Sequence, residues 1–254
     1  MELAQNLLSN LFPSRCILCR KTVNGQSVDG PVVNERIEIC SDCFKALPRN
    51  DVYCMRCALP LTDDVSGNVL CGRCIQEAPA YDYAYSPFRY EDGIINLVHQ
   101  LKFGEKITYA RTLGEILLNT LQEKLKADGE LLLKSWPDCL LPVPLHNTRL
   151  RQRGFNQSIE IVRVIAKKLK IPIEYNAVIR QRSTSAQTGL NAAQRKKNIK
   201  GAFSLVSEIK EKHVLIIDDV MTTGSTVNEL AKLLKKNKVE CVGVLSIARA
   251  PLKN

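Results

Sequence analysis

The chain has 254 residues, enough for two domains, and 45% of them are hydrophobic while 24% are charged. This composition is typical of globular proteins and excludes a disordered or collagen-like chain. No apolar run approaches the roughly 20 residues of a membrane-spanning helix, and the N-terminal MELAQNLLSN lacks the basic start of a secretory signal peptide. The sequence therefore predicts a cytoplasmic protein without an integral membrane segment, whose cysteines stay reduced.

Positive charge is concentrated in one part of the chain. The formal net charge is +10, yet residues 1–80 carry 8 basic and 9 acidic side chains. Residues 144–203 carry 13 basic and 2 acidic side chains, a net charge of +11. Such a concentration predicts a local site for a polyanion, such as the phosphates of a nucleotide, of pyrophosphate or of nucleic acid.

Residues 1–13 are predicted to form a short N-terminal helix. Leucine and phenylalanine side chains recur on one face of this segment until Pro13 ends it. We expect the helix to pack on its own protein. A membrane-surface anchor is the alternative, and the lack of Lys and Arg in the segment disfavours it.

Residues 14–80 are rich in turn residues and contain eight of the ten cysteines. The eight form four CxxC pairs, which are Cys16 and Cys19, Cys40 and Cys43, Cys54 and Cys57, and Cys71 and Cys74. Each CxxC turn places two sulfurs on one side of a loop, and two such turns supply the four thiolates that zinc prefers. The segment therefore predicts a double zinc-ribbon domain with two structural zinc ions, too short to fold without metal.

The sequence leaves open which CxxC pairs share a metal. The simplest partition is sequential, with the first two pairs on one zinc and the next two on the other, and a crossed pairing is the alternative. Disulfides are disfavoured in a reducing compartment. An iron–sulfur cluster fits four repeated CxxC turns less well than paired ribbons do.

The pattern after residue 80 is that of an ordinary folded domain. Five aromatic residues alternate at period two, namely Tyr81, Tyr83, Tyr85, Phe88 and Tyr90. They predict a strand or hairpin whose aromatic row packs in the core. Stacking on single-stranded bases is the alternative, disfavoured because few basic residues interleave with the row. Helices are predicted near 94–103 and 109–126.

From residue 136 onward, apolar runs alternate with helical segments. The apolar runs cover 139–143, 171–179, 213–218 and 239–248, and the helices lie near 156–170 and 225–236. This alternation predicts a parallel sheet with helices on both faces, in a domain that spans 81–254. Ligands of such sheets bind beyond the carboxyl ends of the strands.

The most informative group of candidate ligand-binding residues lies at the end of the apolar run at 213–218. Two acids end this strand, and a hydroxyl- and glycine-rich turn then opens a helix; the residues are Asp218, Asp219, Thr222, Thr223, Gly224, Ser225 and Thr226. The turn and the helix start suit a monoester phosphate, and the two carboxylates suit a vicinal diol. A 5-phosphorylated ribose has both groups, and the acids also favour Mg²⁺ nearby.

The stretch 214–226 resembles the fingerprint of type I phosphoribosyltransferases, which bind phosphoribosyl pyrophosphate. The stretches 142–157, with the string HxxRxxxRGFNQ, and 182–203, together with LKF at 101–103 and the CxxC pairs, resemble the ComF family of competence proteins. The resemblance covers nearly the whole chain. It implies an α/β protein with the type I phosphoribosyltransferase fold, a parallel sheet flanked by helices, preceded by a small double zinc-ribbon domain.

The basic stretch after the first sheet strand suits a pyrophosphate. Arg149 and Arg153 can bind phosphoryl oxygens bidentately with Mg²⁺, and Gly154 permits close backbone approach. His146 is a candidate proton donor to a leaving pyrophosphate, with a structural role as the alternative. The resemblance implies catalytic roles for Asp218, Asp219, Arg149 and Arg153. It also implies a weakly structured hood loop at 180–200 that closes over the ligand. This loop contains Arg182, where many relatives have lysine, with Thr184, Gln187 and Arg195.

Two functions of different classes follow from these features. The resemblance implies a cytosolic competence factor that binds phosphoribosyl pyrophosphate and supports the handling of incoming single-stranded DNA in natural transformation, with competence or recombination proteins as candidate partners. The alternative is an active, Mg²⁺-dependent phosphoribosyltransferase that transfers ribose 5-phosphate to an unidentified nitrogen acceptor. The basic stretch 144–203 suits either, because both ligands are polyanions.

Overall fold

The computed structural model describes residues 15–23, 38–62, 69–103, 107–128, 136–182 and 192–251. The helix expected at 1–13 and the part of the expected hood at 183–191 fall outside these ranges. Among the described helices, none combines the length and the hydrophobicity that crossing a membrane requires.

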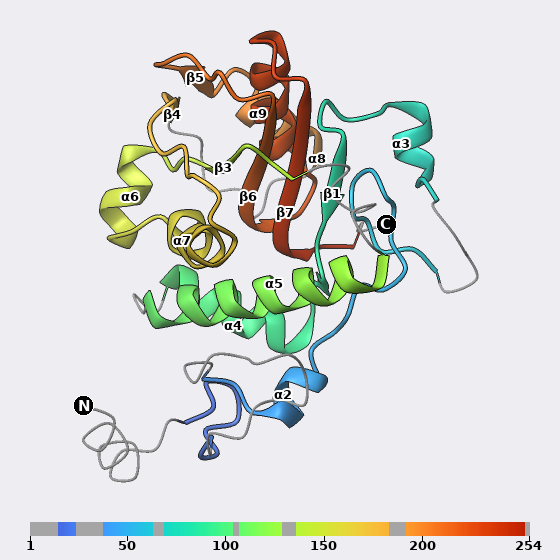
Figure 1. Cartoon of the computed structure of the whole chain (residues 1–254), viewed down its shortest axis with the longest axis vertical. Helices are drawn as coiled ribbons and strands as arrows, with labels where there is room; N and C mark the ends of the chain where they lie inside the picture. The colour runs from blue at the N-terminus through green and yellow to red at the C-terminus, as the bar shows by residue number, and fades with distance from the viewer. Residues whose placement is uncertain are drawn as a thin grey trace.

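Five described strands form one parallel sheet in the order β1-β7-β6-β3, and β2 continues along β7 beyond β1 (Figure 1). The strands are β1 (Tyr83–Tyr85), β2 (Phe88–Arg89), β3 (Cys139–Pro142), β6 (His213–Met221) and β7 (Cys241–Arg249). The central strands β6 and β7 are almost continuously buried, because their apolar runs are covered on both faces. The predicted parallel sheet is confirmed.

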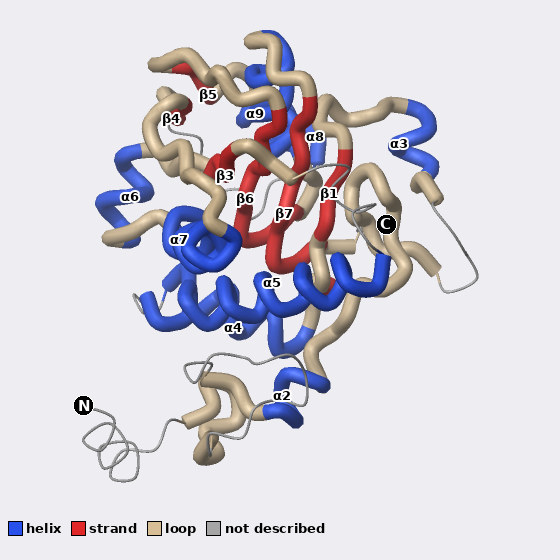
Figure 2. Tube along the Cα trace, in the orientation of Figure 1, coloured by secondary structure: helices blue, strands red, loops and turns tan. Residues whose placement is uncertain are grey.

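Helices cover the two faces of the sheet (Figure 2). The helices expected from the sequence are α4 (Asp92–Phe103), α5 (Ile107–Asp128), α7 (Gln157–Leu169) and α9 (Ser225–Lys236). Helix α7 packs on β3 and β6 and is itself covered by α5, while α9 packs on β6 and β7. The cysteine-rich segment adds two short helices, α2 (Ser41–Lys45) and α3 (Gly72–Gln76).

Two further helices, α6 (Asn147–Arg153) and α8 (Ala192–Ile199), lie where the sequence suggests loops. Helix α6 forms because its ends are capped. His146 Nδ1 accepts a hydrogen bond of 3.2 Å from the Thr148 amide, and Gly154 ends the helix in the left-handed conformation with a φ of 74°. The basic stretch after β3 is therefore a short helix rather than an open loop.

The run at 171–179 touches the parallel sheet without forming a full strand of it, so the expectation of a parallel strand there is wrong. Ile173 forms an isolated parallel bridge to Leu140. The chain then turns away, because the Glu174 carboxylate accepts hydrogen bonds from two backbone amides that follow it, at 3.0 and 2.9 Å. The run ends in β4 (Val178–Arg180), which pairs antiparallel with β5 (Phe203–Leu205) in a separate two-stranded sheet.

The aromatic row after residue 80 packs in the core. Tyr81, Tyr83, Tyr85 and Phe88 expose at most 6% of their surface, so these rings cannot stack on bases. Strands β1 and β2 both pair with β7 and not with each other, so the row forms two short parallel strands instead of a hairpin. The Tyr83 hydroxyl lies 2.8 Å from His213 Nε2, which satisfies its polar end.

The two halves of the cysteine-rich segment lie at different places on the sheet domain (Figure 1). The first half packs on the start of α4, where Leu18 and Leu47 surround Gly93. The second half lies beside β1 and the end of β7, next to the carboxyl edge of the sheet. Both halves are therefore attached to elements of the domain that follows them.

Tyr83 approaches β7 so closely that position 243 requires glycine. A Cβ atom there would lie 2.3 Å from the Tyr83 ring. Gly243→Ala should lower the free energy of unfolding by about 1–3 kcal/mol, the usual cost of overpacking a core, as measured by urea unfolding. In a Tyr83→Leu background the same substitution should cost much less, because the ring is gone. An unchanged unfolding midpoint for Gly243→Ala would contradict this packing.

Candidate functional site

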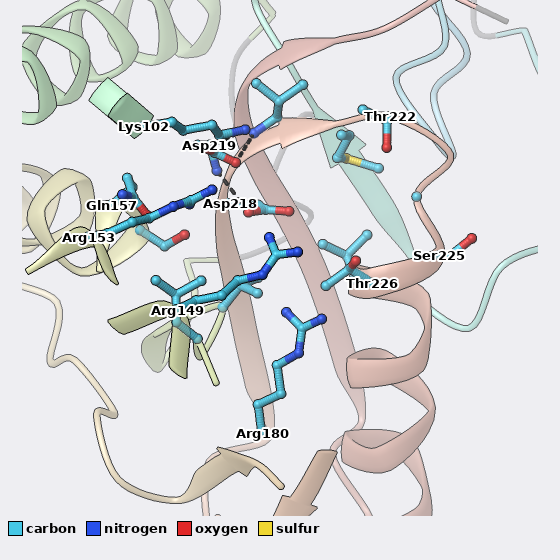
Figure 3. Close-up of a pocket in the computed structure, with 17 residues that line it drawn as sticks. Lys102, Arg149, Arg153, Gln157, Arg180, Asp218, Asp219, Thr222, Ser225 and Thr226 are labelled. Carbon is cyan, nitrogen blue, oxygen red and sulfur yellow. Dashed lines mark hydrogen bonds and ion pairs between the residues drawn. The ribbon is translucent and has the colours of Figure 1, made fainter. Parts of the chain in front are cut away.

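A cavity of about 740 Å³, including the solvent at its mouth, lies beyond the carboxyl ends of β3 and β6 (Figure 3). Its lining comes from the end of α4, from α6, from the start of α7, and from β4, β6 and the turn that leads into α9. The polar residues and the glycine of this lining are Lys102, Arg149, Arg153, Gln157, Ser158, Arg180, Asp218, Asp219, Thr222, Gly224, Ser225 and Thr226. The fold thus brings the predicted acid pair, the predicted phosphate loop and two predicted arginines to one place.

The two acids at the end of β6 have different surroundings. The Asp219 carboxylate lies 2.8 Å from the Lys102 ammonium. Burial alone would raise the pKa of Asp219, but this contact outweighs it and lowers the pKa. Burial and repulsion from Asp219 raise the pKa of Asp218 to about 7. Near neutral pH the cavity therefore holds one ionised carboxylate, Asp219, and one that is only partly ionised, Asp218.

Three guanidinium groups converge on the cavity in front of Asp218 (Figure 3). Arg153 Nη1 donates a hydrogen bond of 3.1 Å to Gln157 Oε1, which orients this arginine. Arg180 is 9% exposed, and burial together with the nearby Arg149 lowers its pKa to about 10. An anionic ligand would remove the repulsion among these like charges, so the cluster favours such a ligand.

The turn between β6 and α9 has the form of an anion-binding helix start. Gly224 adopts a φ of 76° directly before Ser225, the first residue of α9. The Thr223 and Ser225 hydroxyl oxygens lie 2.8 Å apart and brace the turn. Thr222, Gly224, Ser225 and Thr226 line the cavity, whereas Thr223 lines a second cavity on the other side of the turn. The positive end of the α9 dipole therefore faces the first cavity.

Two residues of the predicted pyrophosphate stretch support α6 and are not part of the cavity lining. Gly154 ends the helix and His146 caps its start, as described above. Both contacts set the direction of the helix that carries Arg149 and Arg153. The hydrogen bond that His146 accepts supports a structural role for this residue rather than the role of a proton donor.

The described part of the predicted hood is more regular than an open loop, since it contains α8 and lies between the paired strands β4 and β5. Arg182 donates hydrogen bonds of 3.2 and 2.6 Å to the carbonyl oxygens of Asn198 and Lys200 at the end of α8. Thr184 and Gln187 lie outside the described residues, as does the side chain of Arg195. Closure of the hood over a ligand stays a prediction.

Sequence patterns do not single out Lys102 and Arg180 as site residues. Both stand at the end of an apolar segment, and such segments indicate core. One signal points to Lys102: it is the cation of the LKF motif, next to the fully buried Leu101. Long cationic side chains in such positions extend to a polar site when one lies near.

Each group of four cysteines has the geometry of a tetrahedral metal site. Within each group all Sγ atoms lie within 4.8 Å of one another. One Sγ–Sγ distance in each group is 3.7 Å, and zinc bound to four thiolates predicts about 3.8 Å. The sequential partition is confirmed, with Cys16, Cys19, Cys40 and Cys43 in the first group and Cys54, Cys57, Cys71 and Cys74 in the second.

Four thiols in one group need a cation before all of them can ionise. A hydrogen bond with the Cys57 thiol lowers the pKa of Cys54 to about 4, while the same bond and burial raise the pKa of Cys57. Burial raises the pKa of Cys74 to about 12. Zn²⁺ supplies the positive charge that stabilises the remaining thiolates. Because four sulfurs complete its coordination, such a zinc is structural.

We expect two zinc ions per chain in freshly purified protein, measured by elemental analysis. Cys54→Ser/Cys57→Ser should retain one zinc, because the two groups have no cysteine in common. Cys241→Ser is the matched control and should retain two, since Cys241 lies in β7 outside both groups. A thiol-modifying reagent should release both ions and unfold the cysteine-rich segment. Protein that contains no zinc would contradict the assignment.

Comparison with known proteins agrees with this architecture. Residues 7–75 match the double zinc ribbon domain, and residues 156–253 match the phosphoribosyl transferase domain. DNA utilization protein YhgH of Escherichia coli is 35% identical over 237 residues, which cover 93% of this chain and 97% of that protein. Competence protein F of Haemophilus influenzae is 33% identical over 246 residues, covering 96% and 100%, respectively.

A more distant relative, Competence protein ComFC of Streptococcus pneumoniae, is 24% identical over 245 residues, covering 92% of this chain and all of that protein. These similarities extend over both the cysteine-rich segment and the sheet domain. With its two groups of four cysteines ahead of a phosphoribosyltransferase domain, the chain belongs to the ComF family of competence and DNA utilization proteins.

Proposed function

We propose that the cavity binds phosphoribosyl pyrophosphate with Mg²⁺, and that the chain acts in the cytoplasm in the handling of incoming single-stranded DNA during natural transformation. One observation carries the first part: a single cavity joins a carboxylate pair, a helix start and three guanidinium groups. The names of the relatives, DNA utilization protein and competence protein, support the second part.

The ribose 5-phosphate end of the ligand fits the turn between β6 and α9. The 5-phosphate lies at the N-terminus of α9, where Ser225 and Thr226 line the cavity and the helix dipole favours an anion. Asp218 and Asp219 accept hydrogen bonds from the two ribose hydroxyls. Lys102 keeps Asp219 ionised for this role.

The pyrophosphate end fits the cationic side of the cavity. Arg149, Arg153 and Arg180 pair with phosphoryl oxygens, for which the planar guanidinium is well shaped. The Asp218 carboxylate is a hard oxygen ligand of the kind that Mg²⁺ prefers, and substrate phosphates usually complete the coordination of this ion. Four cationic and two acidic side chains in the lining leave a net positive charge for the anion.

A second candidate function, transfer of ribose 5-phosphate to a nitrogen acceptor, is favoured by the same three guanidinium groups. In such a transfer the acceptor nitrogen forms a bond to C1 of the ribose while the bond from C1 to the pyrophosphate oxygen breaks. Arginines fixed around the pyrophosphate stabilise the negative charge that it gains. Pyrophosphate release from phosphoribosyl pyrophosphate in the presence of Mg²⁺ and ammonia tests this chemistry.

Exposed basic residues outside the cavity suit the phosphates of a single strand. Arg151 on α6 and Arg163, Lys167 and Lys168 on α7 are exposed, and the two helices are neighbours (Figure 1). The positive charge of 144–203 thus divides between the cavity and the solvent-facing surface. Exposed cations of this kind bind a phosphate backbone without reading its sequence. Competence or recombination proteins are the candidate protein partners.

Binding of phosphoribosyl pyrophosphate with Mg²⁺ should strengthen as the pH rises from about 6 to about 8. The pKa of Asp218 is raised to about 7, so below neutral pH its carboxyl is largely protonated and has lost its charge. Ligand binding favours the ionised form. The affinity should therefore rise by up to about tenfold per pH unit below the pKa and level off above it. Calorimetry at constant ionic strength measures this profile.

The variant Asp218→Asn distinguishes the titration of Asp218 from that of the ligand phosphates, because it removes only the former. The variant should bind at least about tenfold more weakly above neutral pH, because a hydrogen bond to a charged group contributes about 1.5–3 kcal/mol, and its profile should be flatter. Lys102→Met should move the rise to higher pH, since Lys102 lowers the pKa of both acids. A profile of Asp218→Asn that matches the wild type would refute the assignment.

The logarithm of the affinity for a single-stranded oligonucleotide should fall linearly with the logarithm of the salt concentration, measured by fluorescence anisotropy. Each neutralised phosphate contributes about −0.7 to the slope. Glutamine at Arg151, Lys167 and Lys168 should flatten the slope by up to about 2. The same variant should keep its affinity for phosphoribosyl pyrophosphate, because these residues do not line the cavity.

Glutamine at Lys210, Lys236 and Lys238 is the matched control, since these lysines are equally exposed but lie outside 144–203. We expect the control to change the slope by much less. Equal effects of the two triple variants would show that DNA does not prefer the α6–α7 surface. Failure of any oligonucleotide to bind at about 50 mM salt would refute the DNA role and leave the sugar-phosphate site unaffected.

A further inference from the structure

Arg249, the last residue of β7, is 2% exposed and joins the second cysteine group to the turn that follows β6. Its Nε donates a hydrogen bond of 3.0 Å to the Cys57 carbonyl oxygen. Its Nη1 donates to the carbonyl oxygens of Met221, at 3.1 Å, and of Thr222. One guanidinium thus holds the backbone of a cysteine ligand and the backbone of the cavity turn in a fixed relation.

The charge of Arg249 also matches the second cysteine group. Among the ion pairs of the described residues, none with an aspartate or glutamate involves Arg249. Its guanidinium lies beside Cys57, because Nε contacts the carbonyl oxygen of this residue. A zinc ion with four thiolates carries a formal charge of about −2. A buried cation beside such a group is stabilised by it.

Direct packing between the second cysteine group and the turn is incomplete. A cavity of about 690 Å³, including open solvent, is lined by Cys57, Cys71 and Cys74 on one side and by Thr223 and Gly224 on the other. Because side chains do not fill this space, the position of the turn relative to the cysteine loop depends on hydrogen bonds between residues that border the cavity. A flexible connection would otherwise be expected.

Two smaller contacts hold the same region. The Ala80 amide donates a hydrogen bond of 2.7 Å to Asn228 Oδ1 on α9, and the buried Tyr81 hydroxyl lies beside Gly224. These contacts attach the chain that leaves the cysteine group to the start of α9. Within the described ranges, however, the hydrogen bonds that join a cysteine of this group to residues 221–225 all come from Arg249.

We propose that Arg249 is a positioning residue that makes the order of residues 221–225, and through it the binding of a phosphate monoester in the cavity, depend on zinc in the second cysteine group. Zinc draws the four sulfurs together and so fixes the Cys57 carbonyl that anchors the guanidinium. Loss of the metal frees that loop, and Arg249 loses its anchor on the cysteine segment. The identity of the phosphate ligand rests on the proposed function, whereas the link between zinc and the turn does not.

The first cysteine group is a built-in control. It contacts the start of α4 at Gly93, whereas the α4 residue in the cavity is Lys102 at the other end of the helix. No hydrogen bond between its described residues and the turn at 221–225 is present. Removal of zinc from the first group should therefore leave the turn unchanged.

Hydrogen exchange of the amides of residues 221–226, measured without ligand, tests the link. Full-length protein with two zinc ions is compared with Cys40→Ser/Cys43→Ser and with Cys71→Ser/Cys74→Ser, each shown by elemental analysis to hold one. We expect the turn to exchange at least about tenfold faster in the second variant and at the wild-type rate in the first. Equal exchange in all three proteins would overturn the proposal.

Two substitutions of Arg249 keep the test valid even if loss of a zinc unfolds the chain. Arg249→Met retains an unbranched side chain but has no donor. Arg249→Lys retains the charge, yet one ammonium cannot span both sides as the guanidinium fork does. With both zinc ions still bound, both variants should show faster exchange at 221–226. If Arg249→Lys exchanges at the wild-type rate, the positive charge alone is sufficient, and the bridging role of the guanidinium is overturned.

The coupling must also act in reverse, from ligand to metal. In Cys40→Ser/Cys43→Ser, all the zinc taken by a chromogenic chelator comes from the second group. Phosphoribosyl pyrophosphate with Mg²⁺ should slow this release several-fold, and adding Arg249→Met should abolish the slowing. Ligand that binds by calorimetry without slowing the release would overturn the proposal. If the protein fails to bind the ligand while exchange at 221–226 still depends on zinc, the proposed function is refuted and the link between zinc and the turn is supported.

Discussion

Two carboxylates on consecutive residues at the end of a buried strand repel each other, and the Lys102 ammonium at 2.8 Å from Asp219 makes their burial tolerable. Much of the site follows from this contact. Helix α4 must end beside the carboxyl edge of β6, and Asp218 keeps a raised pKa because the cation neutralises its neighbour first. Three arginines then lie around the less neutralised acid, and this arrangement supports the proposal that the cavity binds an anion with Mg²⁺.

The zinc groups are integrated into the domain that holds this cavity. The first group packs on the start of α4, whose other end carries Lys102. The second group reaches the β6–α9 turn through Arg249. Each metal site therefore supports an element that lines the cavity, although neither contributes a side chain that faces a ligand there. We infer that zinc orders this short segment and that the order extends to the elements on which it packs.

The excess positive charge is divided between the cavity and the exposed surface, because α6 and α7 each present more than one face. Alternate residues of α6 point in different directions, so Arg149 and Arg153 line the cavity while Arg151 is exposed. Burial lowers the pKa of Arg153 and of Arg180 in the cavity, and a cluster of this kind suits one compact anion. Exposed cations are solvated and screened, and they suit an extended anion such as a nucleic acid backbone.

The sequence by itself determined the features that depend on local spacing. CxxC turns placed sulfurs in pairs, alternating apolar runs specified a parallel sheet, and the contiguous stretch from Asp218 to Thr226 carried its acids and its turn together. The tertiary structure alone decided which distant groups meet. Lys102 and Arg180 end apolar segments that indicate core, and Arg249 ends a buried strand. Their contacts depend on how helices and strands pack, and spacing along the chain does not encode such contacts.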